Sequence, residues 1–595
     1  YKQYIMSGVG KFGGAMIPLL IMLIAATTFM GIFSSVWLSY WTEDKFKNRS
    51  TSFYMGMYSF FVFGDFIFMA ILFTLICHIG VMASKRLNLK AVHRILHTPM
   101  SYLDTTPMGR ILNRFTKDTD SLDHEITDNL RLFLFQIGQV IGVCVMCIVY
   151  LPWFAIAIPF ILLALIIITD HYQSSGREIR RLEAIQRSHV YNNINEVLGG
   201  METIKNFKSE ARFLAKSDYL IDKMNEASFL YIAVQIWVAI FLDMVATAFA
   251  LIITLLCVTR AFPIGPGSVG VLLSYVLQLP SLINNVLRAF TQCENDMNSA
   301  ERLVEYATKL PLEAVYRKAE FTPEESWPRN GVIDFKNVDF AYRPGLPNVL
   351  KNLTLHIASG EKIGICGRTG AGKSTIMSAL YRLNEVNAGS ILIDGIEIAN
   401  LGLYDLRRKL TIIPQDPVLF KGTIRKNLDP FNENSDDALW DALQKSGAIE
   451  KKDLPTIRAQ TTGEDDTHTS MNRFHLEQIV EEEGTNFSLG ERQVLALARA
   501  LVRQSKILIL DEATSSVDYE TDDKIQKKIV DAFGNCTILC IAHRIKTILG
   551  YDRIVVMDKG EIVESASPWD LYSNKTSIFR SMCTRSGITD ADFKH

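Results

Sequence analysis

A glycine-rich segment has the residue types and spacing of a phosphate-binding loop. It reads Gly367-Arg368-Thr369-Gly370-Ala371-Gly372-Lys373-Ser374-Thr375 and matches G-x-x-x-x-G-K-[ST]. Glycines let backbone N–H groups converge on phosphates, and a helix that follows directly points its positive end at the anion. The apolar run 362–366 predicts the preceding strand that this motif requires. We therefore expect Lys373 to neutralise β- and γ-phosphate oxygens and Ser374 to coordinate Mg²⁺.

Polar side chains follow two other apolar runs in the second half of the chain. Asp511 and Glu512 come directly after 507–510, and His543 follows 537–541. The carboxyl ends of parallel strands meet at one sheet edge, where such sheets bind ligands. Asp511 is suited to holding the metal ion, Glu512 to polarising an attacking water, and His543 to contacting the γ-phosphate.

A further motif precedes the apolar helical run 494–502. Ser488 and Glu491 have the S-x-x-E spacing of a capping box. A helix N-terminus that carries Ser488 and Gly490 is also suited to binding a phosphate held by a different subunit or half. The two interpretations are compatible.

The elements that carry these motifs follow a long membrane-like region. A helix needs about 20 apolar residues to cross the hydrocarbon of a bilayer. Six runs meet this need: 16–37, 53–81, 132–150, 154–169, 230–258 and 269–286. The sequence Leu151-Pro152-Trp153 predicts a turn that separates the third helix from the fourth. We therefore predict six transmembrane helices.

Charge patterning predicts the orientation of these helices. The long loops 84–131 and 170–228 are rich in Lys and Arg, which by the positive-inside rule places them in the cytoplasm. The short connections 38–52, 151–153 and 260–267 are then outside, where Asn48 begins a glycosylation sequon. The N-terminal residues do not have the pattern of a signal peptide, and we expect the chain to be part of a longer protein.

Composition excludes two broad classes of protein. The 595 residues are 48% hydrophobic and 10% aromatic, which excludes disorder over most of the chain. The 62 Lys and Arg residues nearly balance 64 Asp and Glu residues, so no basic field exists for a nucleic acid, which we exclude as a partner. The nine cysteines are scattered and are expected to be reduced thiols.

The second half of the chain is separated from the first by a polar segment. Residues 298–328 contain a short helical stretch and then Pro311, Pro323 and Pro328, which is typical of a linker. Strands and helices alternate after it, as in a parallel sheet covered by helices. We predict a membrane domain at 1–297, a linker at 298–330, an α/β nucleotide-binding domain with a helical subdomain at 331–586 and a tail at 587–595.

Taken together, the motifs resemble those of the ATP-binding cassette transporters over essentially the whole chain. The resemblance implies that Tyr342 stacks on adenine, that Gln415 is the Q-loop metal contact, that 487–493 is the signature, that 515–518 is the D-loop and that His543 is the switch histidine. It implies ATP and Mg²⁺ as cofactors and a catalytic set of Glu512, His543 and Gln415. The implied metal ligands are Ser374, Gln415 and Asp511. The implied nucleotide contacts are Tyr342, Gly367, Thr369, Gly370, Ala371, Gly372, Lys373, Ser374, Thr375, Ser488 and Gly490.

The resemblance narrows to subfamily C. Residues 102–114 resemble the first intracellular loop of that subfamily and 199–207 the second coupling helix, while 485–513 and 581–588 are most similar to fungal drug exporters of the oligomycin-resistance type. The similarity is to the C-terminal half of such an exporter. It implies a partner N-terminal half, a lipid bilayer and a hydrophobic drug substrate. It also implies a multi-pass protein of the plasma membrane, or alternatively the vacuolar membrane, with a cytosolic nucleotide-binding domain.

Two alternatives to drug export remain open at this point. Subfamily C also contains ATP-gated channels or channel regulators, and it contains exporters of organic anions and glutathione conjugates. The conjugate exporters resemble R-W-x-x-x-R-L-E/D in the fifth span, whereas this chain has Ile236 and Phe241 at the positions of the two arginines and so lacks both cations. A cavity with Trp237 and Phe241 suits neutral amphipathic drugs better. Asp65 and Asp243 are expected to be buried charges at membrane depth, which are paired or functional.

The signature departs from the family consensus L-S-G-G-Q. Phe487, Leu489 and Glu491 replace the leading Leu, a Gly and the Gln. A leucine side chain crowds the backbone where it approaches phosphate. We therefore expect asymmetric ATP sites, in which the site completed by this signature hydrolyses poorly and the hydrolytic site is built on Lys373, Asp511, Glu512 and His543. The polar insertion 451–473 ahead of the signature is expected to be a solvated surface loop.

Overall fold

The computed structural model describes residues 1–593 apart from 11–12, 47–48, 153, 260–264, 344, 461–471, 512–527, 530–531 and 543. Asn48, Glu512, His543 and the predicted D-loop 515–518 therefore lie outside the described residues. The chain forms two compact units. The first consists of Tyr1–Leu96 and Met108–Leu310, and the second of His97–Pro107 and Pro311–His595.

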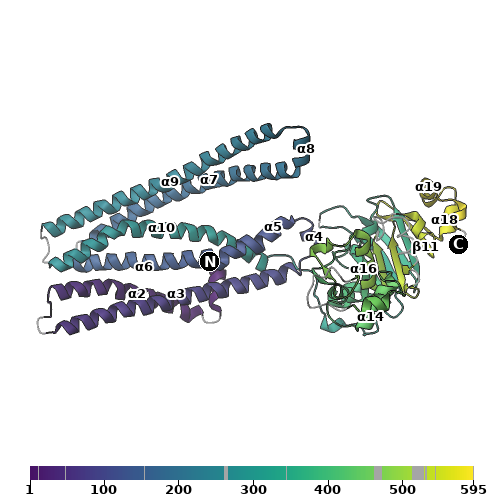
Figure 1. Cartoon of the computed structure of the whole chain (residues 1–595), viewed down its shortest axis with the longest axis horizontal. Helices are drawn as coiled ribbons and strands as arrows, with labels where there is room; N and C mark the ends of the chain where they lie inside the picture. The colour runs from purple at the N-terminus through teal and green to yellow at the C-terminus, as the bar shows by residue number, and fades with distance from the viewer. Residues whose placement is uncertain are drawn as a thin grey trace. The chain divides into compact units, whose positions relative to one another are not determined.

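Six long helices build the first unit, each containing one of the six predicted spans (Figure 1). They are α2 (Gly13–Thr42), α3 (Thr51–Ile95), α6 (Ile126–Tyr150), α7 (Phe154–Gly199), α9 (Glu210–Val258) and α10 (Pro266–Thr308). Within the described residues, five stretches are long and apolar enough to cross a membrane: Gly13–Thr42, Thr51–Ile95, Met108–Tyr150, Glu210–Val258 and Pro266–Thr308. The predicted division of the third and fourth spans is confirmed, because α6 ends at Tyr150 and α7 begins at Phe154.

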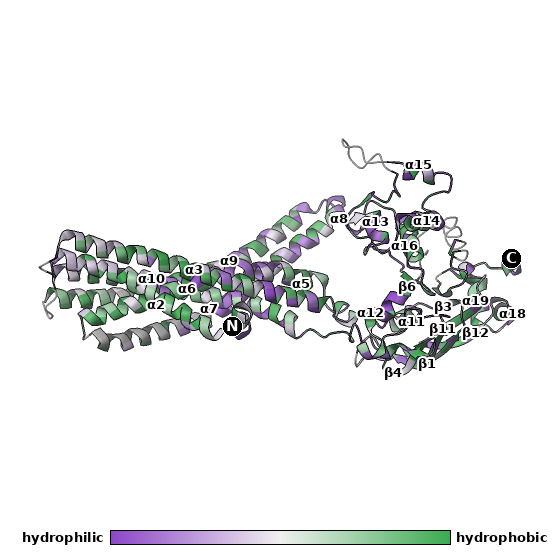
Figure 2. Cartoon of the chain, turned by 90° about the horizontal axis from the view of Figure 1, so that it is seen from below, coloured by the Kyte–Doolittle hydropathy of each residue, from purple (hydrophilic) through white to green (hydrophobic). Residues whose placement is uncertain are grey.

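The helices extend well beyond the predicted spans. Segments predicted as cationic loops are mostly helical, since α3 continues to Ile95, α7 continues to Gly199 and α9 begins at Glu210. Lys, Arg, Glu and Gln are good helix formers, so a helix that leaves the apolar layer has no local reason to end. Figure 2 shows the resulting change along α7 and α9, from apolar residues (green) to polar ones (purple) toward α8. The shorter elements of this unit are α1 (Lys2–Val9), α5 (Met108–Asn113), α8 (Met201–Asn206) and two π-helical stretches at Arg114–Asp118 and Ser121–Glu125.

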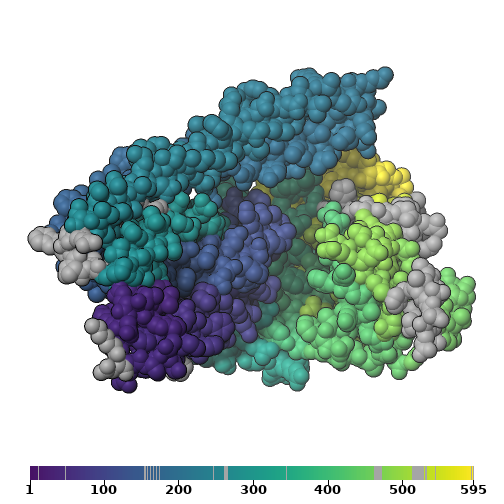
Figure 3. Space-filling view, turned by 60° about the vertical axis from the view of Figure 1, so that its left-hand side comes forward, coloured from purple at the N-terminus to yellow at the C-terminus, as the bar shows by residue number. Residues whose placement is uncertain are grey.

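Helices α7 and α9 form a long hairpin that is closed by α8. They pack against each other along their length, and α9 also packs against α10. Toward α8 the hairpin stands away from α2, α3 and α6 as an arm of the unit (Figures 1 and 3). Many apolar side chains of the arm are exposed in this chain, among them Phe229 and Leu251.

Glycines set the spacing of α2, α3 and α6. A Cβ on Gly80 of α3 would lie 2.1 Å from Oγ1 and 3.0 Å from Cβ of Thr127 on α6. On α6 itself, Gly138 and Gly142 face α2, where a Cβ on Gly142 would lie 2.4 Å from a methyl of Thr28. Small residues four apart let helix backbones approach closely within a membrane. Gly138-x-x-x-Gly142 has this spacing, which the sequence analysis did not use.

The second unit contains a six-stranded sheet of order β12-β11-β3-β10-β9-β6. All neighbouring strands are parallel except β12, which runs antiparallel to β11 at the edge. The three strands predicted at 362–366, 507–510 and 537–541 are confirmed, and the first two are one residue longer than expected. The strands are β3 (Lys362–Gly367), β6 (Leu410–Ile413), β9 (Ile507–Asp511), β10 (Thr537–Ile541), β11 (Arg553–Asp558) and β12 (Glu561–Ala566).

A smaller antiparallel sheet of order β2-β1-β4-β5 packs over the same apolar core. Its strands are β1 (Ile333–Phe340), β2 (Leu350–Ile357), β4 (Ala388–Ile393) and β5 (Ile396–Glu397). Helices of this unit include α4 (Met100–Leu103), α11 (Lys373–Leu380), α12 (Leu403–Lys409), α18 (Pro568–Ser573) and α19 (Ile578–Arg585). His97 joins the unit through its carbonyl oxygen, which accepts a 2.8 Å hydrogen bond from the Glu313 N–H.

A helical subdomain with its own core follows β6, as expected. Trp440, Leu443 and Phe487 belong to this core. The subdomain consists of β7 (Gly422–Thr423), α13 (Ile424–Leu428), α14 (Asp436–Ser446), α15 (Leu454–Arg458), β8 (Ile479–Val480) and α16 (Leu489–Arg503). The insertion 451–473 is therefore not wholly a solvated loop, because α15 forms within it and buries Ile457.

The segment predicted as a C-terminal tail packs onto the second unit. Ile588 is buried, and the Phe593 ring lies 4.5 Å from that of Tyr572 between centroids. Asp592 forms a 3.1 Å ion pair with Lys546. Apolar contact and charge thus hold residues 588–593 against the domain.

Adding one methyl group at Gly80 tests the close packing of α3 on α6. We expect Gly80→Ala to lower the thermal unfolding midpoint of the transporter in detergent, because overpacking costs about 1–3 kcal/mol. Gly56→Ala lies on the same helix and meets nothing within 4 Å, so it should leave the midpoint unchanged or raise it. Equal midpoints for the two variants would contradict the packing described here.

Candidate nucleotide-binding site

The glycine-rich loop connects β3 to α11 and is shaped by its three glycines. Gly367, Gly370 and Gly372 have φ angles of 149°, 80° and 98°, which favour glycine over residues with a side chain. Gly367 also allows close approach, since its Cβ would lie only 2.3 Å from the carbonyl oxygen of Met557 on β11. Nothing lies within 4 Å of a Cβ on Gly370, so the loop has open space beside it. The loop is a backbone cradle with room for a ligand.

Two predicted site residues lie in direct contact across the sheet. The Ser374 Oγ donates a 3.2 Å hydrogen bond to Asp511 Oδ1. Asp511 ends β9, and the register places it level with Ile541 of β10, which is level with Ile365 of β3. The expectation that this carboxylate and the loop share one sheet edge agrees with that register. A hydroxyl and a carboxylate oxygen are the hard donors that Mg²⁺ prefers.

Lys373 and Tyr342 also lie at the loop. Lys373 Nζ donates a 2.9 Å hydrogen bond to the carbonyl oxygen of Gly367, which keeps the ammonium over the cradle. The Tyr342 hydroxyl lies 2.9 Å from Thr375 Oγ1, and its ring packs edge-on against Phe340 with centroids 5.4 Å apart. The structure therefore gathers an aromatic ring, an ammonium and two oxygen donors around the loop.

Gln415 is not joined to this group. It is exposed two residues after β6, and its backbone oxygen accepts a 3.5 Å hydrogen bond from Gln493 Nε2. Within the part of the chain that the structure describes, no hydrogen bond links the Gln415 side chain to Ser374 or Asp511. Ser488 and Gly490 likewise make no hydrogen bond to the loop among the described residues and lie at the start of α16.

The predicted capping box at the start of α16 is confirmed. The Glu491 N–H donates to Ser488 Oγ at 3.3 Å, and the Ser488 N–H donates to Glu491 Oε2 at 2.7 Å. Arg473 lies in the insertion 451–473, and the sequence analysis gave it no role. Its Nε forms a 2.5 Å ion pair with Glu491 Oε1. A pairing across 18 residues leaves no local signal in a sequence, so only the fold reveals it.

Two protein families match the chain. The ABC transporter transmembrane region matches residues 17–286, and the ABC transporter family matches 350–515, which encloses both Ser374 and Asp511. The chain belongs to the ATP-binding cassette transporters. The glycine-rich loop lies within the part of the chain that matches the ABC transporter family.

The chain is similar to fungal and human proteins. The chain is 72% identical over its full length to an oligomycin resistance ATP-dependent permease of Saccharomyces cerevisiae, of which it covers 40%. It is 39% identical over 96% of its length to the multidrug resistance protein fer6 of Mycosarcoma maydis, covering 41% of that protein. It is also 39% identical over 99% of its length to ATP-binding cassette sub-family C member 4 of Homo sapiens, covering 44%. The chain thus spans about two fifths of the length of these relatives.

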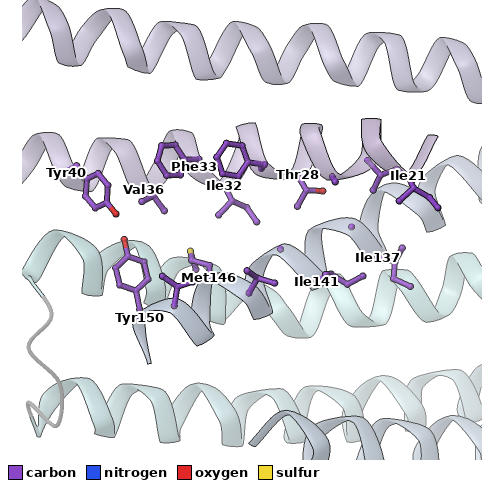
Figure 4. A pocket seen from close by; sticks show the side chains of 17 residues that line it. Ile21, Thr28, Ile32, Phe33, Val36, Tyr40, Ile137, Ile141, Met146 and Tyr150 are labelled. Carbon is purple, nitrogen blue, oxygen red and sulfur yellow. The ribbon is translucent and has the colours of Figure 1, made fainter. Parts of the chain in front are cut away.

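A second candidate site is an apolar pocket of about 800 Å³ between α2 and α6 (Figure 4). Aliphatic and aromatic side chains of the two helices point toward one another, and Tyr40 and Tyr150 face each other at one end. Other hydroxyls are few, with Thr28 among the lining residues. Sequence reasoning missed this pocket because hydropathy marks membrane helices without showing which of their faces enclose a space.

The membrane residues singled out from the sequence lie elsewhere. Trp237 and Phe241 are neighbours on α9 with ring centroids 4.6 Å apart, and both are exposed in this chain. Asp243 was expected to be buried and is exposed on the same helix, because it lies on a different face of α9 from Leu242, which is buried. Asp65 is half-buried on α3 beside Gly31, whose Cβ would lie 3.5 Å from the carboxyl group.

A methyl group added at Gly367 tests whether the loop needs its close contact with β11 to bind nucleotide. We expect Gly367→Ala to abolish the rise in unfolding midpoint that MgATP causes, because the added methyl pushes the loop away from Met557 and distorts the cradle. Gly550→Ala is a matched control on the same domain, since a Cβ there meets nothing within 4 Å. A normal MgATP-dependent shift in Gly367→Ala would contradict this account.

Proposed function

We propose that this chain is one half of an ATP-driven exporter of hydrophobic and amphipathic compounds. The contact between Ser374 and Asp511 at the glycine-rich loop carries the proposal, because it joins two of the predicted nucleotide-site residues on a chain whose described part also holds five stretches able to cross a membrane. The apolar pocket between α2 and α6 supports the substrate class, since it offers few polar groups to an ionic conjugate. The printed names of two relatives, an oligomycin resistance permease and a multidrug resistance protein, agree with this class.

Each residue of the site has a proposed task. Lys373 leaves the carbonyl of Gly367 to neutralise β- and γ-phosphate oxygens, and Tyr342 stacks on the adenine. Ser374, Asp511 and Gln415 hold Mg²⁺, which supplies positive charge to the developing phosphate oxygens when bound. Glu512 polarises the attacking water and His543 contacts the γ-phosphate. Backbone N–H groups of the remaining loop residues bind the phosphate oxygens.

We infer that the missing N-terminal half supplies the second cassette and six further helices. ATP sandwiched between the two cassettes draws them together, and hydrolysis releases them, which drives alternating access. The site completed by Leu489 and Glu491 hydrolyses poorly, and the site built on this chain's loop hydrolyses ATP. The proposed division into a membrane domain at 1–297, a linker at 298–330, a cassette at 331–586 and a tail at 587–595 differs from the two compact units, which divide at Leu310 because α10 continues to Thr308. The plasma membrane is the proposed location, with the cassette in the cytosol.

Removing the proposed base separates ATP binding from hydrolysis. We expect Glu512→Gln in the full transporter to lower ATPase turnover by roughly 10²-fold or more while MgATP binding persists. Glu561→Gln, at an exposed position, is the control and should turn over normally. Turnover in Glu512→Gln equal to that of the control would refute the assignment.

Filling the apolar pocket tests the proposed class of cargo. We expect Ile141→Trp to lower ATP-dependent drug uptake into inside-out vesicles several-fold, because the indole occupies part of a pocket of about 800 Å³. Leu277→Trp on α10 lies outside the pocket at a similarly exposed position and should transport normally. Ion conductance without vectorial drug uptake in the wild-type protein would favour a channel instead.

A further inference from the structure

The N-terminus of α16 carries an acidic side chain. The helix dipole makes this end of a helix partly positive. Glu491 is the third residue of α16, and the acidic run Glu481-Glu482-Glu483 lies just before the helix in sequence and is exposed. Backbone N–H groups at a helix N-terminus attract anions, and a carboxylate at the same place repels a triphosphate. An unneutralised Glu491 would therefore oppose the role proposed for the signature.

Arg473 supplies the opposing charge from a different segment. Its Nε forms the 2.5 Å ion pair with Glu491 Oε1, and its Nη2 donates a 2.7 Å hydrogen bond to the carbonyl oxygen of Asn486. The guanidinium also lies over the Phe487 ring, 5.4 Å from the ring centroid. Three contacts thus fix one cation beside the signature, on residues 486, 487 and 491.

The ion pair is not needed to cap the helix. Ser488 and Glu491 already complete the capping box with hydrogen bonds to each other's backbone N–H groups. Glu491 uses Oε2 for the cap and Oε1 for Arg473, so the two interactions are separate. The Arg473 side chain remains 53% exposed, which leaves part of the cation facing solvent at the helix N-terminus. Because the Arg473 guanidinium is held in place and partly exposed, we infer that its charge acts on the helix N-terminus.

We propose that Arg473 is a positioning residue of the signature: it neutralises Glu491 and keeps the N-terminus of α16 able to receive the triphosphate bound by the partner half. The inference rests on the proposed function. It adds that the signature can bind the triphosphate with Glu491 present only because Arg473 neutralises that carboxylate.

A double-mutant cycle in the full transporter tests the pair. We expect R473Q to raise the MgATP concentration that gives half of the full rise in unfolding midpoint by roughly three- to tenfold, since it leaves the carboxylate unpaired. E491Q removes the negative charge and should lower this MgATP concentration, and R473Q/E491Q should bring it back to the wild-type value or below. R458Q removes an exposed ion pair to Asp437 in the same subdomain and serves as the control.

The cycle distinguishes charge compensation from a structural role. If R473Q/E491Q binds MgATP as weakly as R473Q, or if R473Q binds as well as R458Q, the proposal is wrong. Unfolding midpoints without nucleotide report folding, and R473K should recover much of the affinity if charge is what matters. Failure of the proposed function would give a different result, namely a wild-type transporter that binds MgATP but does not take up drugs into vesicles.

Discussion

The hydrogen bond between Ser374 and Asp511 is the contact on which the nucleotide site depends. It joins the first turn of α11 to the end of β9, and β10 lies between β9 and the strand that feeds the loop. The two groups meet only because the strands are parallel and in a register that brings their carboxyl ends to one edge. Tyr342, two residues after the end of β1, and Lys373, at the start of α11, then complete the surroundings of the loop. The buried sheet therefore provides the precision that the flexible glycines alone lack.

Much of the fold could be predicted from the sequence because its signals are local. Hydropathy located the six spans, and the turn at Pro152 divided the longest apolar run correctly. Where the helices end within the cationic segments 84–131 and 170–228 was not predicted, since charge reports location relative to the membrane but does not end a helix. The spacing of α3 and α6 at Gly80 depends on Thr127, which lies 47 positions further along the chain, and no local pattern predicts that contact.

In the candidate site, too, local motifs were predicted and contacts between distant residues were not. Loop, strand-end carboxylate and capping box were predicted because each is a short motif with a defined position on an element. Arg473 was missed because the insertion that carries it has no motif, and its meaning depends on the acid it meets after folding. The pocket between α2 and α6 was missed for a related reason. Apolar side chains look alike in sequence, whether they fill a core or line an open pocket.

The position of β3 at the middle of its sheet has a consequence for synthesis of the protein. Its two neighbours are β10 and β11, which end at Ile541 and Asp558, near the end of the chain. Asp511 follows Ser374 by 137 residues. A ribosome-bound intermediate can thus contain the entire glycine motif while β3 has neither neighbour and the motif has no carboxylate opposite it. A chain truncated before Ile507 therefore contains the glycine motif without Asp511 and without the two strands that flank β3.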